Sequence, residues 1–157
     1  MGFDVVGFDV EMLPYPGQLV LQDVRTLYGS QFRQARVIVA SPPCEEFSRH
    51  DQPWTKRRNP PPPDLSIVQA CFRIAAEAGV PLVLENVRGA QKWIGRATMR
   101  YGSRYFWGDG LPALFPTPGS DYQMKKWTKQ GLSSDRKRER ALIPYPVALW
   151  VAQCYAT

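Results

Sequence analysis

The residues best suited to chemistry lie in the stretch VIVASPPCEEFSRH, residues 37–50. An apolar run with strand character passes through Ser41 into two prolines and Cys44. Because proline fixes its φ angle, Pro42 and Pro43 place a rigid turn directly before the thiol. A cysteine used only for packing needs no such turn. A thiolate presented at the end of a strand is a nucleophile suited to an electron-poor carbon.

A second polar pair, Glu85 and Asn86, ends the apolar run PLVLEN at residues 81–86. A buried carboxyl group keeps its proton to near neutral pH, so Glu85 is a candidate hydrogen-bond donor to a ring nitrogen. Asn86 is a candidate for fixing backbone or substrate geometry. Two interpretations stay open at this point: Cys44 fills a gap or attacks a substrate, and Glu85 caps a strand or acts as an acid.

The elements that must position these side chains form an α/β pattern. Apolar strand-like runs alternate with a helical one, which is typical of a parallel sheet. Strands are predicted at residues 4–10, 19–24, 35–41 and 81–86, with one more around 105–107. Helices are predicted at residues 65–79, with Asp64 as N-cap and Gly79 as the stop, and at residues 145–156.

Several polar side chains fall at the ends of the predicted strands. In open parallel sheets, ligands bind at the carboxyl ends of the strands. Asp9, Asp23, Cys44 and Glu85 all come to that edge. The run at 35–41 is almost wholly apolar, as expected for a strand covered on both faces. The segment that follows Cys44 is predicted to be a long polar loop, since four consecutive prolines at 60–63 forbid helix and sheet interior alike.

Composition indicates one soluble domain. The chain of 157 residues is long enough to bury a core without covalent staples. Cys44, Cys71 and Cys154 are too widely spaced for a disulfide framework, and a single histidine makes a zinc cluster hard to build. We therefore expect no metal, a reducing cytoplasm, and core packing for Cys71 and Cys154. No apolar run has the length of a membrane span.

The net charge of +6 is concentrated in the KRR run at residues 56–58 and in the basic stretch between residues 125 and 140. Lysine and arginine clusters neutralise phosphates, which indicates a nucleic-acid partner. A solvated basic face is the alternative interpretation. His50 follows the cysteine segment and is a candidate phosphate contact. Trp54 is a candidate DNA contact.

Together, the two motifs resemble a known family. SPPCEEFS is similar to the catalytic loop of C5-cytosine DNA methyltransferases, and LVLENVRG is similar to their Glu-Asn-Val motif. VVGFDVE and LQDV resemble the two strands whose terminal acids hold the adenosine part of S-adenosylmethionine. RERALIPYPVALWVAQ resembles the last motif, which closes the cofactor pocket. The resemblance covers most of the chain.

The resemblance implies a fold and an active site. The fold would be a Rossmann-like, class I S-adenosylmethionine-dependent methyltransferase sheet, with residues 1–157 as one catalytic domain. Cys44 would attack C6 of a cytosine flipped out of double-stranded DNA. Glu85 would contact N3 and the exocyclic amine, with Asn86 beside it. Arg104, in RYGSRYFWG, would lie near the cytosine O2.

The same resemblance implies the binding residues, on what we expect to be a monomer. Those assigned to S-adenosylmethionine are Asp9, Val10, Asp23, Val24 and Pro42. The loop at 49–59 would close over the DNA, with its phosphates bound by Arg49, Lys56, Arg57 and Arg58.

The sequence also departs from the family pattern. The strand and glycine-rich loop that cradle the methionine part of the cofactor are absent, so the sheet is expected to be incomplete at its N-terminus. Met1 would then be an internal methionine of a longer frame, or the chain a remnant. Glu45 replaces a glutamine, and Arg100 and Gly102 replace family residues. The target-recognition region is reduced to residues 101–140, which predicts a short or loose recognition sequence.

Three alternative functions follow from these departures. An inactive remnant would bind DNA through its basic residues without responding to the cofactor. An RNA cytosine methyltransferase would use the same chemistry on another substrate. A relative of thymidylate synthase is disfavoured, because that family places histidine after its cysteine, where this chain has Glu45.

Overall fold

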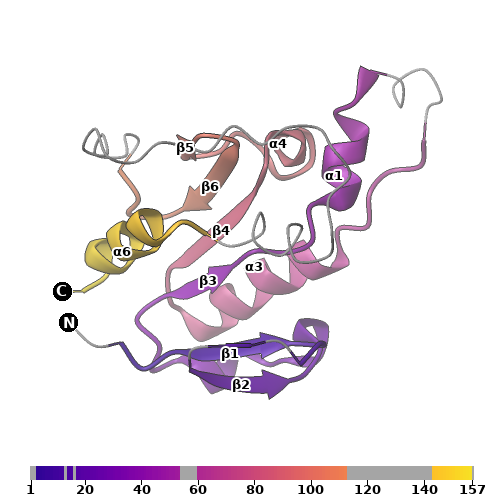
Figure 1. Cartoon of the computed structure of the whole chain (residues 1–157). Helices are drawn as coiled ribbons and strands as arrows, with labels where there is room; N and C mark the ends of the chain where they lie inside the picture. The colour runs from indigo at the N-terminus through magenta and orange to yellow at the C-terminus, as the bar shows by residue number, and fades with distance from the viewer. Residues whose placement is uncertain (1–2, 13, 16, 54–59, 113–142, 157) are drawn as a thin grey trace. The chain divides into compact units, whose positions relative to one another are not determined.

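A computed structural model describes residues 3–12, 14–15, 17–53, 60–112 and 143–156. The chain divides into two compact units, Met1–Ala113 and Leu114–Thr157. The first unit contains every described strand (Figure 1). In the second, the described residues form one helix, α6 (Tyr145–Cys154), close to the predicted range 145–156. No helix in the described ranges is long and apolar enough to cross a membrane.

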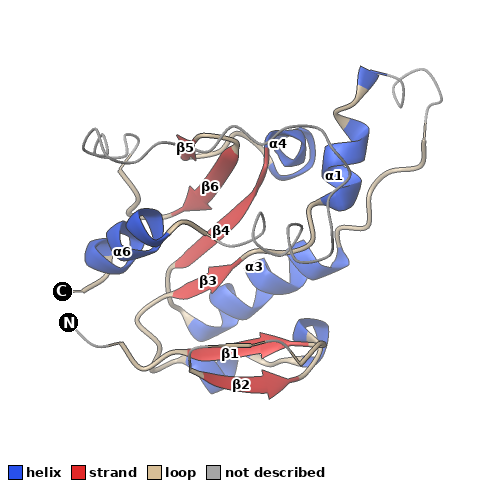
Figure 2. Ribbon diagram, in the orientation of Figure 1, coloured by secondary structure: helices blue, strands red, loops and turns tan. Residues whose placement is uncertain are grey.

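The larger sheet of the first unit has four strands in mixed orientation (Figure 2). Their order is β3 (Ile38–Ala40), β4 (Leu82–Val87), β6 (Arg104–Gly108) and β5 (Met99–Tyr101). β3 and β4 are parallel, whereas β6 runs antiparallel to both β4 and β5. The α/β prediction is therefore confirmed, but a wholly parallel sheet is wrong. A two-residue turn at Gly102, whose φ is 59°, folds β5 and β6 into a hairpin.

The first two strands form a sheet of their own. β1 (Val6–Asp9) and β2 (Gln18–Leu21) are parallel, and no described strand joins them to β3. As a result, β1 and β3 each have one edge with no strand partner among the described residues. The predicted burial of the third strand on both faces is wrong, because β3 is an edge strand and Val39 is 51% exposed.

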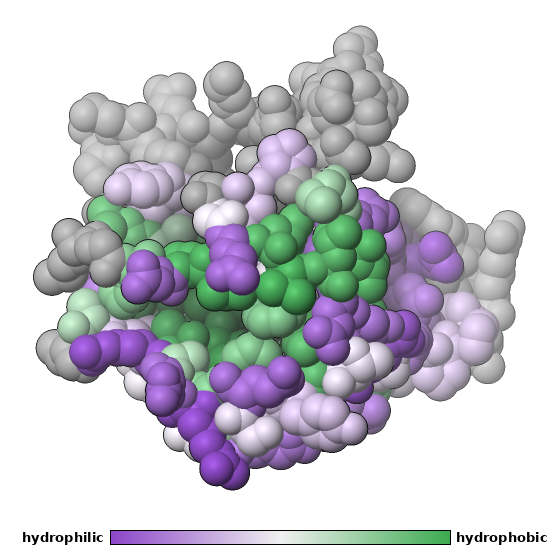
Figure 3. All heavy atoms as spheres, turned by 90° about the horizontal axis from the view of Figure 1, so that it is seen from below, coloured by the Kyte–Doolittle hydropathy of each residue, from purple (hydrophilic) through white to green (hydrophobic). Residues whose placement is uncertain are grey.

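Apolar side chains also gather at the surface. Figure 3 shows them at the centre of the face seen from below, bordered by hydrophilic side chains. The exposed apolar residues of the β1–β2 region include Val5, Val6, Val10 and Leu21.

The core of the first unit lies between the four-stranded sheet and α3 (Ser66–Ala78), the helix predicted at 65–79. One face of α3 buries Val68, Cys71 and Ala75 against Leu82 and Leu84 of β4. The predicted core thiol Cys71 is thus confirmed. The helix ends as predicted at Gly79, which adopts a left-handed φ of 69°. Its N-cap is Leu65 instead of Asp64, whose carboxylate accepts a hydrogen bond from the Ser66 amide at 2.8 Å.

A helix follows Cys44, where a polar loop was predicted. This helix, α1 (Glu45–His50), has two acidic residues in its first turn and two basic residues in its last. Such charges complement the helix dipole, and that signal was present in the sequence. Phe47 anchors α1 in the core at 2% exposure. The remaining short elements are η1 (Val24–Thr26), η2 (Gly29–Phe32), η3 (Arg88–Ala90) and α4 (Gln91–Ile94).

Gly89 allows η3 to approach α1 closely. A Cβ atom at this position would lie 2.3 Å from the backbone oxygen of Phe47, which cannot move without shifting α1. Gly89→Ala is therefore expected to lower the free energy of unfolding by about 1–3 kcal/mol, measured by urea denaturation. The control Ala76→Gly, at an exposed position of α3, should cost about 1 kcal/mol or less. An unchanged stability in Gly89→Ala would contradict this close approach.

Candidate active site

The parallel pairing of β3 with β4 brings the two chemical motifs together. Ala40 pairs with Leu84, so the next residues, Ser41 and Glu85, lie level with each other. The chain then turns through the two prolines, and Cys44 becomes the exposed N-cap residue of α1. Segments more than forty residues apart in the sequence thus meet at the carboxyl ends of β3 and β4, as the sequence predicted.

Asn86 fixes the turn that carries the thiol. Its side chain is 1% exposed, and its Nδ2 donates a hydrogen bond of 3.0 Å to the backbone oxygen of Pro42. Its Oδ1 accepts a hydrogen bond of 2.9 Å from the Val87 amide. A buried carbonyl left without a donor costs about 1–3 kcal/mol, so this contact matters for the turn. Of the two predicted roles, Asn86 has the contacts of a residue that fixes backbone geometry.

Glu85 is a buried carboxyl group with a basic neighbour. It is 8% exposed, and Arg104 Nη1 donates a hydrogen bond of 3.1 Å to its Oε1. The register of β4 and β6 pairs Val87 with Arg104, which puts Arg104 diagonal to Glu85 on one face of the sheet. Burial raises the pKa of Glu85, and Arg104 and the Ser41 hydroxyl only partly offset this rise. Glu85 is therefore suited to holding a proton.

Cys44 is electrostatically coupled to Glu85. The residue is exposed, yet its surroundings remove enough water from the sulfur to raise the pKa of the thiol, and the charge of Glu85 raises it further. A side-chain hydrogen bond with Ser48 acts in the opposite direction. The Ser48 amide also donates to the Cys44 carbonyl at 2.8 Å, within α1. Sequence reasoning missed Ser48, although its place four residues after Cys44 would have indicated one helical turn.

The acids predicted to bind the cofactor lie at one end of the β1–β2 sheet. The Asp9 carbonyl accepts a hydrogen bond of 2.9 Å from the Gln22 amide, which brings the two strand ends together. The Asp9 carboxylate accepts a hydrogen bond from the Glu11 amide at 2.9 Å. Asp23 pairs with the Arg25 guanidinium, whose Nε lies 3.0 Å from both carboxylate oxygens. This partner lowers the pKa of Asp23 to about 2.

The two acids carry the kind of group that the adenosine part of S-adenosylmethionine would require. Ribose hydroxyls and an adenine amine are hydrogen-bond donors, and both acids offer acceptors. Arg25 must first swing away from Asp23, which its half-exposed side chain allows. The flanking Val10 is exposed, and Val24 is half-buried at the start of η1. Pro42, the fifth predicted cofactor residue, is buried, and its carbonyl accepts the hydrogen bond from Asn86.

The residues predicted to bind DNA are only partly described. Arg49 is exposed, but it lies in the last turn of α1 instead of a loop. Lys56, Arg57 and Arg58 lie outside the described residues, as do Trp54 and residues 113–140 of the predicted target-recognition region. Within the described ranges, no group of three or more His, Cys, Asp or Glu side chains could hold a metal ion.

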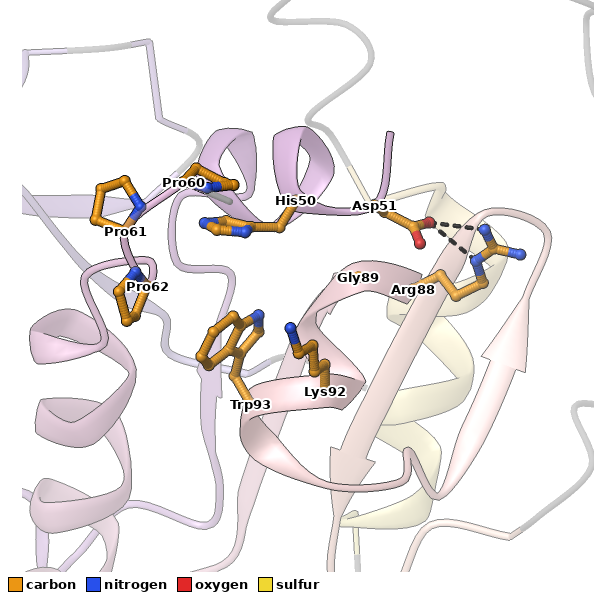
Figure 4. A pocket seen from close by; sticks show the side chains of 9 residues that line it. All are labelled: His50, Asp51, Pro60, Pro61, Pro62, Arg88, Gly89, Lys92 and Trp93. Atoms are coloured by element: carbon orange, nitrogen blue, oxygen red, sulfur yellow. Dashed lines mark hydrogen bonds and ion pairs between the residues drawn. The ribbon is translucent and has the colours of Figure 1, made fainter. Parts of the chain in front are cut away.

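A cavity of about 780 Å³ beyond the far end of α1 was not predicted (Figure 4). His50 and Asp51 line it from the end of α1, and Arg88 and Trp93 line it from the segment that follows β4. The only feature of the sequence that pointed to this cavity was His50, which was predicted as a candidate phosphate contact.

Comparison of this chain with protein-family models, with curated protein sequences and with solved structures finds no match. The family resemblance therefore rests on the motif residues in the sequence.

Removing the charge of Glu85 should make Cys44 more reactive. The pKa of Cys44 is raised in part by the Glu85 carboxylate, so Glu85→Gln is expected to lower this pKa and increase the thiolate fraction. The measurement is the rate of Cys44 alkylation by iodoacetamide between pH 6 and 10, followed by peptide mass spectrometry. The midpoint should move to lower pH in Glu85→Gln.

Cys71 is the internal control for that experiment. Burial raises the pKa of Cys71 to about 11, so its alkylation should stay slow in both proteins. An identical pH profile for Cys44 with and without the Glu85 charge would show that the two groups are not coupled.

Proposed function

We propose that this protein is a cytosine-C5 methyltransferase that acts on DNA, with Cys44 as nucleophile and Glu85 as proton donor. One observation carries the proposal. A rigid prolyl turn, tied down by Asn86, presents an exposed thiol beside a buried carboxyl group whose pKa is raised. A reaction that adds a nucleophile to one ring atom while protonating another needs this combination.

The first step is addition to the ring. The Cys44 thiol loses its proton to water, and the thiolate forms a bond to C6 of cytosine. The C5–C6 electron pair moves toward C5 as Glu85 transfers its proton to N3. The carboxylate left on Glu85 is stabilised by Arg104, which is already within hydrogen-bond distance. Burial favours the protonated form of Glu85 before attack, and Arg104 stabilises the charge that develops during it.

The second step is substitution at C5 and release. S-adenosylmethionine, when bound, supplies an electrophilic methyl group. After the methyl group has been transferred to C5, a base removes the original proton from C5. The N3 proton returns to Glu85 and the C6–S bond breaks, which regenerates the Cys44 thiolate. Asn86 keeps the sulfur in one position throughout, because it holds the Pro42 carbonyl and so the turn that precedes the cysteine.

DNA fits the charge of the protein. The net charge of +6 favours a polyanion, and Arg49 and His50 lie in the last turn of α1, the helix that begins at Cys44. A cytosine inside a duplex cannot reach a thiol, so the base would leave the helical stack.

Exchange of the cytosine C5 hydrogen tests the nucleophile without the cofactor. Thiolate addition lets C5 take a proton from water and then lose its own, so DNA tritiated at cytosine C5 should release tritium. Cys44→Ser is expected to reduce this release by about two orders of magnitude or more while DNA binding persists. Cys154→Ser is the matched control and should retain it. Full release by Cys44→Ser would rule out this nucleophile, and faster release from cytosine-labelled transfer RNA than from duplex DNA would favour an RNA substrate.

A second candidate function is DNA binding without methyl transfer. It is favoured by the Asp23–Arg25 ion pair, which occupies both oxygens of a predicted cofactor ligand. Calorimetric titration with S-adenosylmethionine separates the two candidates. For a methyltransferase we expect binding that Asp23→Ala weakens about tenfold or more, since an ionised acceptor is lost.

Arg25→Gln is the companion variant for that titration. It frees Asp23 and should leave binding intact or tighter. The absence of any heat signal with the unmodified protein, together with salt-dependent DNA binding, would favour the second candidate.

A further inference from the structure

We infer that the cavity lined by α1, η3, α4 and Pro60–Pro62 holds one nucleotide of the nucleic-acid strand, with its phosphate at Lys92 and Trp93. This inference rests on the proposed function, because it takes the substrate to be a nucleic acid. The cavity volume of about 780 Å³ lies within the range of small-molecule sites.

The cavity has one cationic corner. Lys92 Nζ lies 4.7 Å from the centroid of the Trp93 ring. Figure 4 shows the Lys92 ammonium and Trp93 Nε1 side by side, both facing the space below His50. The Trp93 Nε1–H is buried and has no acceptor among the described residues. An ammonium beside an unpartnered N–H donor is suited to a phosphate oxygen.

The neighbouring groups add to the same preference. The His50 ring packs edge-on against Trp93, with centroids 5.5 Å apart. Arg88 donates two hydrogen bonds to Asp51 Oδ2, at 3.0 and 2.8 Å, and this ion pair ties η3 to the end of α1. The charges of Arg88 and Asp51 offset each other. The ammonium of Lys92 therefore makes the charge of the cavity positive, which favours an anion.

The opposite wall is apolar. Pro61 and Pro62 lie across the open space from Lys92, and Pro60 lies beside His50 (Figure 4). Proline rings and an indole offer flat apolar surface for a sugar or a base, and contact with aromatic side chains is tolerant of base identity. A cationic corner opposite an apolar wall matches a nucleotide better than a free inorganic anion.

The position relative to Cys44 agrees with a strand that passes both sites. The six residues of α1 separate Cys44 from the cavity, and a helix of that length spans about 9 Å. One strand of duplex DNA advances about 3.4 Å per nucleotide. The nucleotide held in the cavity would thus be about two to three steps from the target cytosine.

The test uses the full chain and a 14-base-pair cytosine-containing duplex. The indole N–H resonance of Trp93, assigned from its loss in Trp93→Phe, should shift on DNA addition. Trp93→Phe keeps an aromatic ring, removes the N–H donor and should weaken binding about two- to tenfold. Lys92→Gln should make the slope of log Kd against log salt shallower by about one. Arg33→Gln, at the end of η2 and outside the cavity, serves as the control for loss of one charge.

The outcomes separate this inference from the proposed function. A Trp93 shift together with weaker binding in both cavity variants than in Arg33→Gln supports the site, even if no tritium is released from cytosine. If tritium is released but DNA does not shift the Trp93 resonance, the nucleotide site is overturned and the proposed function is not. Equal effects of Lys92→Gln and Arg33→Gln also overturn it. A shift produced equally by 10 mM inorganic phosphate overturns the nucleotide assignment in favour of a small-anion site.

Discussion

The hydrogen bond from Asn86 Nδ2 to the Pro42 carbonyl is the contact on which the candidate active site depends. β3 and β4 are parallel neighbours, but pairing alone fixes only the residues inside the strands. The chain leaves β3 at Ala40, and the thiol lies four residues further on. The two prolines restrict that path, and the buried amide holds its middle in place. Cys44 therefore has a defined position although it is exposed.

The electrostatics of the site follow from the same sheet. Glu85 and Asn86 are consecutive in β4, so their side chains point to opposite faces. Asn86 can then hold the turn while Glu85 meets Arg104 from β6. Burial favours the protonated form of Glu85, whereas Arg104 favours the ionised form. A carboxyl group balanced in this way is suited to giving up a proton and taking it back during one reaction cycle.

The two sheets differ in how complete their surroundings are. The β4 strand is buried between β3 and β6, and Val83 and Leu84 are fully covered. In contrast, the two strands of the smaller sheet leave Val6 and Leu21 about half exposed. Glu85 thus lies on a buried inner strand of the larger sheet, and Cys44 follows the edge strand β3 of the same sheet. The predicted cofactor residues Asp9 and Asp23 belong to the smaller, more exposed one.

Local sequence signals determined the elements and the candidate residues. The 3.6-residue period and Gly79 predicted α3, the apolar runs predicted β1 to β4, and the prolyl turn identified Cys44. The sequence also contained the charge pattern of α1, but the four prolines at 60–63 led to the prediction of a loop instead of this helix. Only the tertiary structure decided that β6 returns antiparallel, that the strands form two sheets, and that Asn86 binds Pro42. It also brought Lys92 and Trp93 to the end of α1. These features depend on contacts between segments far apart in the chain, and a local pattern of residue types does not encode which segments meet.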